Sequence, residues 1–456
     1  MAASRQPHAL LTEGAIGKTL LVFSLPILAT NVLQSLNGSV NAVWVGRYLG
    51  AAALTATSNA NTIVFLLIGA MFGLGMAAAI MLGQSIGAKD VEGAKRVVGT
   101  SVAFFFYASL VVAIAGFVFS PTILDWMRTP DDALPYAIAY LRVVFLATPF
   151  AFVSAIMTML LRGAGDARTP LVYSALAVGL DVALNPLFIF GAGPIPALGI
   201  AGSAVAALIA NALACFALLG HLYGRKHDLR LRRDELRYLR IDRAVLGALV
   251  RKGTPMGLQM IVMTASAVVM TSLVNRFGSA TAAAYGAALQ LWNYIQMPAI
   301  AIGMAASSMA AQNVGARLWE RVGRVAVVGV AINFGMTGAL AIIIHTFDRS
   351  ALGLFLADSE AIAIAVHLNT IVVWSFTLFG VSMVLSSVVR STGAVAVPLA
   401  ILVVALWCVR MPFAVALLDR WQADAIWWSF PLGSITSMVL SIAYYRYGGW
   451  RQARMT

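Results

Sequence analysis

Long apolar runs recur along the chain, and they indicate that it folds in a lipid bilayer and not in water. Three of them are Val102–Val118, Ile371–Val389 and Val395–Leu418, of which the last contains a single charged residue. A helix needs about 20 apolar residues to cross a hydrocarbon core roughly 30 Å thick. Only 11% of the residues are charged, whereas soluble globular chains carry about 25%. The runs are continuously apolar and do not alternate with polar residues, so they predict an all-α membrane protein and argue against a β-barrel.

The chain holds twelve such spans, and the charge of the segments between them alternates. We place the spans at roughly 19–43, 53–80, 97–120, 136–160, 169–190, 197–222, 251–275, 281–308, 323–346, 361–387, 395–418 and 425–446. Every second connection carries most of the Lys and Arg residues, and the other set is richer in acids. Basic connections stay on the cytoplasmic side, so we expect a multi-pass protein of the inner (plasma) membrane with both termini in the cytoplasm. The polar arm before the first span lacks a small-residue cleavage site, and we expect it to be retained.

The formal net charge of +13 would suit either nucleic acid or an anionic lipid surface, and its distribution favours the second. The longest connection, 225–243, holds eight Lys/Arg residues against four acids. Orientation of the spans and contact with anionic lipid account for this stretch without nucleic acid. We therefore expect membrane lipid, and no nucleic acid, among the partners.

The chain also repeats itself. Three segments return at an offset of 228 residues: Gly75–Ala78 as Gly303–Ala306, Gln84–Lys89 as Gln312–Arg317, and Arg162–Leu171 as Arg390–Leu399. Because six helices preserve orientation, the repeat predicts two pseudo-symmetric six-helix lobes around a central cavity. We divide the chain into an N-lobe (1–223), a basic cytoplasmic inter-lobe linker (224–246) and a C-lobe (247–456). Lobes of this kind suit alternating access, so a transporter is favoured over a channel.

The order and spacing of short motifs along nearly the whole chain carry a resemblance. The motifs are Pro26, Val43–Gly50, Gln84-x-x-Gly87-Ala88, Leu161–Pro170, Leu184–Gly191, Gly199–Ala204, Arg410-Met411-Pro412 and Ile426-Trp427. They resemble the multidrug and toxin compound extrusion (MATE) family of cation antiporters. The resemblance implies a V-shaped, two-lobed fold and export driven by a proton or sodium gradient.

Two departures from the family pattern bear on the coupling ion. The proton-coupled prokaryotic branch commonly has an aspartate where Asn41 stands, and its helix 5 commonly reads Asn-x-x-x-Asp-Pro. Here the acid and the amide have changed places, as Asp181 and Asn185. Positions i and i+4 share a helix face, so Asp181 should still look into the N-lobe cavity. A sodium-coupled branch has an acid in helix 7 where Met263 stands, which argues against sodium chemistry in the C-lobe.

A census of the acids points to the same residue without the family. Of 18 acids, only Asp181 lies well inside a predicted span. A charge in the bilayer is costly, and intramembrane acids usually line cavities and act in relays. Burial favours the neutral acid and nearby cations favour the charged one, so such a group can take up and lose a proton. The alternative is an aspartate that only joins neighbouring helices. Pro186 supports the functional reading, because broken helical backbone is tolerated beside protein or a wet cavity.

Further candidates line predicted helix faces. Asn31, Gln34, Asn37 and Asn41 follow steps of three, three and four along the first span, and so lie on one side of a helix. They predict a cavity lining, with helix–helix hydrogen bonding as the alternative. Asn41 and Asn185 join Asp181 in the predicted cation-coupling site.

The C-lobe supplies the other substrate-cavity candidates. Met256, Met260 and Met263 have helical spacing and suit promiscuous binding, although core packing explains them equally well. Arg410 is the second intramembrane charge. It is either part of the cavity or a structural charge satisfied by carbonyls or by snorkelling.

The sequence thus predicts a secondary antiporter that exports organic cations or drugs in exchange for protons. Sodium coupling and flipping of a lipid-linked precursor stay open as alternatives. Its two cysteines and five histidines show no metal-ligand spacing, and HExxH, GxSxG and paired intramembrane carboxylates are absent from the sequence. We therefore expect neither an enzyme, nor a metal site, nor a cofactor, and nothing in the sequence demands more than a monomer.

Overall fold

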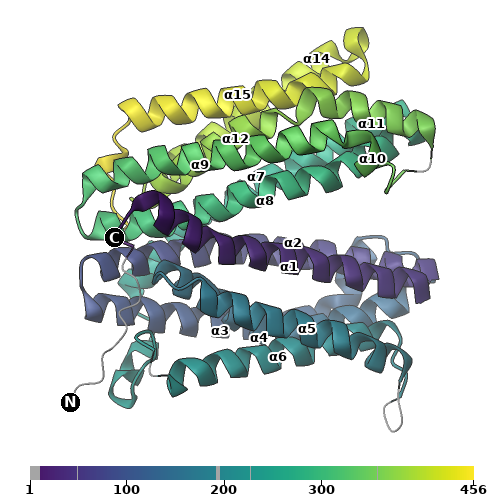
Figure 1. The fold of residues 1–456 in the computed structure, drawn as a ribbon. Helices are drawn as coiled ribbons and strands as arrows, with labels where there is room; N and C mark the ends of the chain where they lie inside the picture. Colours follow the sequence, from purple (N-terminus) through teal and green to yellow (C-terminus); the bar gives the residue numbers. More distant parts are fainter. Residues whose placement is uncertain (1–10, 49, 192–195, 226, 357, 456) are drawn as a thin grey trace. The chain divides into compact units, whose positions relative to one another are not determined.

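A computed structural model describes residues 11–48, 50–191, 196–225, 227–356 and 358–455, and this part of the chain is helical without a β-strand (Figure 1). The long helices are α1 (Ile16–Tyr48), α2 (Gly50–Gly87), α3 (Val91–Trp126), α4 (Leu134–Gly163), α5 (Arg168–Phe190), α6 (Ile200–Gly224), α7 (Arg243–Val274), α8 (Ser279–Gly315) and α9 (Trp319–Thr346). The shorter ones are α10 (Asp348–Leu352), α11 (Ser359–Val372), α12 (Ser375–Arg390), α13 (Ala396–Val403), α14 (Met411–Trp421) and α15 (Ala423–Tyr447). The predicted all-α class is confirmed.

Within the described residues, eleven helical stretches are long and apolar enough to cross a membrane, and a bent pair makes a twelfth. The prediction of a single helix over 361–387 missed this bend. The span consists of α11 and α12, which meet at 45°. At the bend, the Phe376 N–H donates to the Val373 carbonyl, and the Ser375 hydroxyl donates to the Val372 carbonyl at 2.6 Å. The hydroxyl therefore satisfies a carbonyl that a straight helix would have paired with Phe376.

The eleventh predicted span is interrupted as well. A π-helical turn, Val404–Arg410, lies between α13 and α14. Pro412 follows it at the second residue of α14, and proline has no N–H to donate to the carbonyl one turn earlier. Such turns are frequent at functional sites, and this one ends at Arg410.

The chain divides into two compact units. The first comprises residues Met1–Leu28, Gly87–Lys89 and Thr254–Thr456, and the second Ala29–Ile86 and Asp90–Gly253. Helix α1 thus contributes its beginning to one unit and its end to the other. The division of the sequence at residues 223 and 247 into lobes and linker stays a prediction.

In the unit containing Thr254–Thr456, α8 packs against α9, α11 and α12, and α15 covers α12. Its core holds an aromatic cluster of Tyr285, Trp292, Trp427 and Phe430. The indole N–H of Trp292 donates to Asn369 Oδ1 at 2.9 Å. A buried indole needs such a partner, so the bond fixes the ring within the core.

A close backbone contact in the same unit explains one of the repeated glycines. A Cβ atom on Gly87 would overlap the Gln312 carbonyl oxygen and lie 2.7 Å from the carbonyl carbon. Gln312 is fully buried, and its Oε1 accepts the Leu11 N–H at 3.0 Å. Only glycine leaves room for this approach, so Gly87 is required by packing.

In the other unit, α4 packs against both α3 and α6, and α5 packs against α6. A core of Val45, Leu124, Ala137, Leu141 and Phe145 lies among these helices and the end of α1. This packing brings the end of α1 and the middle of α5 into the same unit, where the candidate site forms.

The basic connection after α6 is folded onto the start of α3. Lys95 Nζ lies 3.0 Å from Glu235 Oε2 and also donates to the Arg230 carbonyl. The Asp242 N–H donates to Thr100 Oγ1 at 3.2 Å. A Cβ atom on Gly99 would lie 2.5 Å from the Tyr238 carbonyl carbon, so the two backbones are in contact. The connection, which includes the short 3₁₀ helix η1 (Arg233–Leu239), is therefore held against α3 by these contacts.

A second anchor joins this connection to the turn between α4 and α5. Asp166 Oδ1 accepts the N–H groups of Arg168 and Thr169, both at 3.0 Å, and so caps α5. Its Oδ2 lies 3.7 Å from His227 Nε2, while His227 Nδ1 accepts the Leu229 N–H at 3.1 Å. Burial alone would raise the pKa of Asp166, but the interactions with His227 and Thr169 outweigh it and hold that pKa below its ordinary value.

The charge of Asp166 should therefore stabilise the folded state. Asp166→Asn keeps an oxygen that can cap α5 but loses the attraction to His227, and we expect it to cost about 1 kcal/mol at pH 7. Asp166→Ala also loses the cap, at a further cost of about 1 kcal/mol. A depressed pKa stabilises above the unfolded-state value, so the penalty for Asp166→Asn should shrink as the pH falls below about 4. Thermal unfolding in detergent between pH 7 and pH 3, with Asp131→Asn as the exposed control, measures this; a pH-independent penalty would contradict it.

Candidate functional site

The one acid deep inside the predicted spans is buried in the structure. Asp181 lies in the middle of α5 and is 3% exposed, and Asn185, one turn later, is fully buried. Pro186 follows inside the helix, so the Val182 carbonyl loses its usual helical donor. The two polar side chains are therefore held on one buried face next to a weakened point of α5.

Three amide groups surround the Asp181 carboxylate. Asn37 Nδ2 and Asn41 Nδ2 donate to Oδ2 at 2.9 and 3.0 Å. Asn185 Nδ2 lies 3.2 Å from Oδ1 and 2.9 Å from the Asp181 backbone carbonyl. It also donates to Asn41 Oδ1 at 2.8 Å. One network of four side chains thus ties α1 to α5.

This carboxylate has no cationic partner among the described residues. Neutral amides satisfy its charge, and that charge also acts on the half-buried Tyr140 of α4. A buried carboxylate without a counter-ion is sensitive to anything that adds or removes positive charge nearby. The arrangement therefore suits the reversible binding of a cation.

Two amide oxygens of the network are unused in the described structure. Asn37 Oδ1 and Asn185 Oδ1 are buried and have no hydrogen-bond partner among the described residues. An ionised carboxyl only accepts hydrogen bonds, whereas a protonated one also donates. The cluster thus holds donors for the ionised form and spare acceptors for the protonated form.

The four polar residues predicted to share one face of α1 have different surroundings in the structure. Asn37 and Asn41 belong to the network, whereas Asn31 is half-buried and Gln34 is exposed, and neither bonds to Asp181 among the contacts of the described residues. The helical period correctly placed the four on one face, but only the two residues level with Asp181 reach it. A role for Asn31 and Gln34 in a substrate cavity stays a prediction.

The C-lobe candidates lie in the other compact unit. On α7, Met256 is buried, while Met260 and Met263 are half-buried. The guanidinium of the half-buried Arg410 lies 3.5 Å from the centre of the Phe430 ring, a cation–π arrangement. Its Nε is buried without a hydrogen-bond partner among the described residues. The substrate role of all four residues stays a prediction.

Arg390 and Arg162 lie just outside the predicted spans 361–387 and 136–160, where loop cations are expected, yet both are buried. Arg390 is the last residue of α12 and donates to Gln259 Oε1 at 2.6 Å and to Ser387 Oγ at 2.8 Å. The signal was available in the repeat, because Arg162 and Arg390 correspond at the offset of 228 residues. Tyr140 was also missed, since a tyrosine near a helix end resembles an interfacial aromatic residue.

The described helices are long and apolar enough for a multi-pass membrane protein, and one unit holds a buried polar network. The MatE family model matches this chain twice, over residues 26–187 and 255–416, which places one copy in each half. The chain belongs to the MATE family of multidrug efflux transporters. This confirms the family and the fold inferred from the sequence.

Individual relatives cover almost the whole chain. It is 36% identical to the probable multidrug resistance protein YoeA of Bacillus subtilis (strain 168), covering 98% of this chain and 96% of that protein. It is 31% identical to the probable multidrug resistance protein YpnP of the same organism, covering 97% and 98%. Among solved structures, an outward-facing multidrug resistance MATE family transporter matches with a TM-score of 0.89 at 20% identity, over 98% of both chains. That structural likeness shows the fold.

Proposed function

We propose that this protein is an antiporter that exports organic cations and related drug-like compounds in exchange for protons, and that Asp181 carries the proton. The observation that carries the proposal is the buried Asp181 carboxylate, which is held by three amide donors and has no counter-ion among the described residues. The names of YoeA and YpnP as probable multidrug resistance proteins support the substrate class.

The network offers a physical route from protonation to movement. Ionised Asp181 holds Asn37 and Asn41 of α1 against α5 through their Nδ2 groups. Protonation weakens these charge-assisted bonds and creates an O–H donor, for which the spare oxygens of Asn37 and Asn185 are candidate acceptors. The tie between α1 and α5 then rearranges, and a cationic substrate loses its electrostatic partner. Proton and substrate therefore exclude each other at Asp181.

Sodium is a second candidate coupling ion. The spare oxygens Asn37 Oδ1 and Asn185 Oδ1 lie beside the carboxylate, and carboxylate and amide oxygens are the ligands that hard cations take. Sodium would bind at the same acid as the proton. The two alternatives are therefore distinguished by which ion gradient drives transport.

The alternating charge of the connections supports insertion in the inner membrane with both termini cytoplasmic. The proposed mechanism requires one chain and no cofactor besides the coupling ion.

Uptake of a fluorescent organic cation into inside-out vesicles tests the coupling ion. We expect an imposed proton gradient without sodium to drive uptake by the wild type, and a sodium gradient without a pH difference to leave uptake at the level of vesicles lacking the protein. Uptake driven by sodium alone would assign the coupling to sodium. If neither gradient drove uptake of the fluorescent cation by correctly inserted protein, cation antiport would be rejected.

A further inference from the structure

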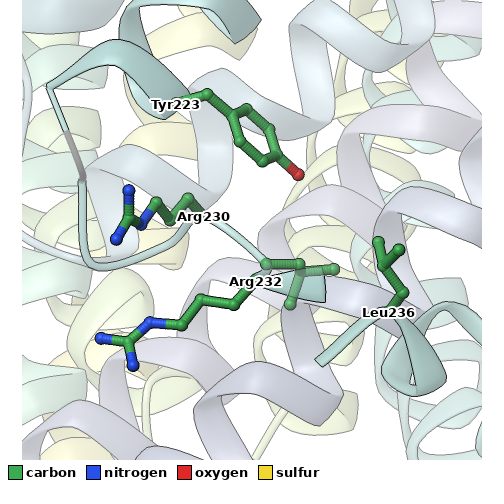
Figure 2. A pocket seen from close by; sticks show the side chains of 5 residues that line it. Tyr223, Arg230, Arg232 and Leu236 are labelled. Carbon is green, nitrogen blue, oxygen red and sulfur yellow. The ribbon is translucent and has the colours of Figure 1, made fainter. Parts of the chain in front are cut away.

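A cavity of about 380 Å³ opens at the end of α6, between the last turn of that helix and the connection that follows it. Its lining is Tyr223, Arg230, Leu231, Arg232 and Leu236. Figure 2 shows the guanidinium groups of Arg230 and Arg232 extending toward the same side, with Leu236 at the opposite side and the Tyr223 ring above. The cavity thus has a cationic side and an apolar side.

The two guanidinium groups are available for a ligand. Neither guanidinium makes a hydrogen bond or an ion pair with another described residue, although the charge of Arg232 also acts on Glu235. The nearby acid Glu235 already has partners. Its Oε2 accepts the backbone N–H of Arg232 at 2.9 Å and lies 3.0 Å from Lys95 Nζ. These contacts hold the pKa of Glu235 below its ordinary value, although burial alone would raise it. Each guanidinium presents its donors in a fork that matches the oxygens of a phosphate, and the two groups extend toward the same side.

The backbone that carries these arginines is already ordered. The Arg230 carbonyl accepts from Lys95 of α3, His227 is anchored at Asp166, and Gly99 packs against the Tyr238 carbonyl. A ligand that binds here does not have to pay for ordering of the connection. The cationic side of the cavity is therefore preorganised.

The surroundings indicate a lipid and not a soluble anion. α6 is membrane-spanning and ends at Gly224, so Tyr223 stands at the level where aromatic side chains meet lipid headgroups. Tyr223 at the end of α6 is exposed, as are the apolar side chains Leu236, Leu239 and Ile241 of the connection that follows. A polar anion would leave these side chains in water, whereas a phospholipid covers them with its glycerol and acyl chains.

We propose that this cavity binds the headgroup phosphate of an anionic phospholipid, with Arg230 and Arg232 on the phosphate and Tyr223 and Leu236 against the lipid body. The site fixes the basic connection to the membrane surface. It is independent of the coupling ion and of Asp181.

Native mass spectrometry of the full-length protein, with phosphatidylglycerol titrated against phosphatidylcholine, tests the site. We expect Arg230→Gln/Arg232→Gln to retain one phosphatidylglycerol fewer and to bind that lipid about tenfold more weakly. The matched control is Arg225→Gln/Arg240→Gln, which removes the same charge from exposed positions of the same connection and should bind as the wild type does.

Thermal unfolding provides the second readout and separates the sources of phosphate. Phosphatidylglycerol should raise the Tm of the wild type and of the control, and it should raise the Tm of Arg230→Gln/Arg232→Gln by much less. Inorganic phosphate at millimolar concentration should leave all three unchanged. Equal weakening in both double variants would overturn the proposal in favour of a diffuse charge effect. A Tm rise with inorganic phosphate as large as with lipid would assign the cavity to a soluble phosphate and overturn the lipid.

Discussion

Replacing Asp181 with asparagine is expected to abolish proton-driven export. The variant cannot bind and release a proton at the centre of the network, so the uptake rate in inside-out vesicles under a proton gradient should fall at least about tenfold, to the level of vesicles lacking the protein. Asparagine has the same shape, its oxygen accepts from Asn37 and Asn41, and its new amide group can donate to the spare amide oxygens. The fold should therefore survive, with a Tm close to that of the wild type.

A second assay separates lost coupling from lost folding. Exchange of labelled for unlabelled substrate without any gradient requires the alternating cycle but no net proton movement. Asp181→Asn should therefore retain exchange at saturating substrate, with a weaker affinity for the cation because its electrostatic partner is gone. Asp132→Asn, which removes an exposed acid of the segment before α4, should transport at the wild-type rate under the same gradient. Gradient-driven uptake by Asp181→Asn at half the wild-type rate or more would reject Asp181 as the coupling residue.

The largest expected loss of stability comes from Gly87→Ala. The added methyl group would overlap the Gln312 carbonyl oxygen, and the obstacle is backbone of α8, which cannot rotate away as a side chain can. Overpacking against backbone costs about 1–3 kcal/mol or more. We expect a Tm several degrees below that of the wild type in detergent and a smaller amount of protein in the membrane.

Gly286→Ala is the matched control for this change. Gly286 lies in α8, and a Cβ atom built there has no neighbour within 4 Å. Alanine is the better helix former by about 1 kcal/mol, so this variant should be as stable as the wild type or slightly more stable. If both variants shifted the Tm equally, the close approach of Gly87 to Gln312 would not be the reason for glycine.

The helices were predictable because each one, taken separately, must be long and apolar enough to cross the bilayer. The runs predicted the number of spans, and the period of 3.6 residues placed Asn37 and Asn41 on one face of α1. The bend between α11 and α12 was not predictable, because no proline marks it and the Ser375 hydroxyl that supports it is an ordinary side chain in an apolar run.

Contacts between helices were the part that the sequence left open. An isolated aspartate in a span indicates a polar partner, but periodicity does not say which helix provides it, and the bonds from Asn37 and Asn41 to Asp181 depend on tertiary packing. The predicted span 361–387 likewise left Arg390 in a loop, although it is buried and donates to Gln259 of α7. The internal repeat was the better guide. Arg390 recurs as Arg162 at the equivalent position of the first half, which indicates a structural role in both halves.

Proton release on substrate binding tests the central claim most directly. Purified protein in weakly buffered detergent solution at constant pH is mixed with the fluorescent organic cation, while a pH indicator records protons and fluorescence records binding. If proton and substrate exclude each other at Asp181, the wild type should release up to one proton for each substrate bound, with or without sodium, and Asp181→Asn should release none. Saturation of the wild type with substrate without proton release at every pH tested, or equal release from Asp181→Asn, would contradict it.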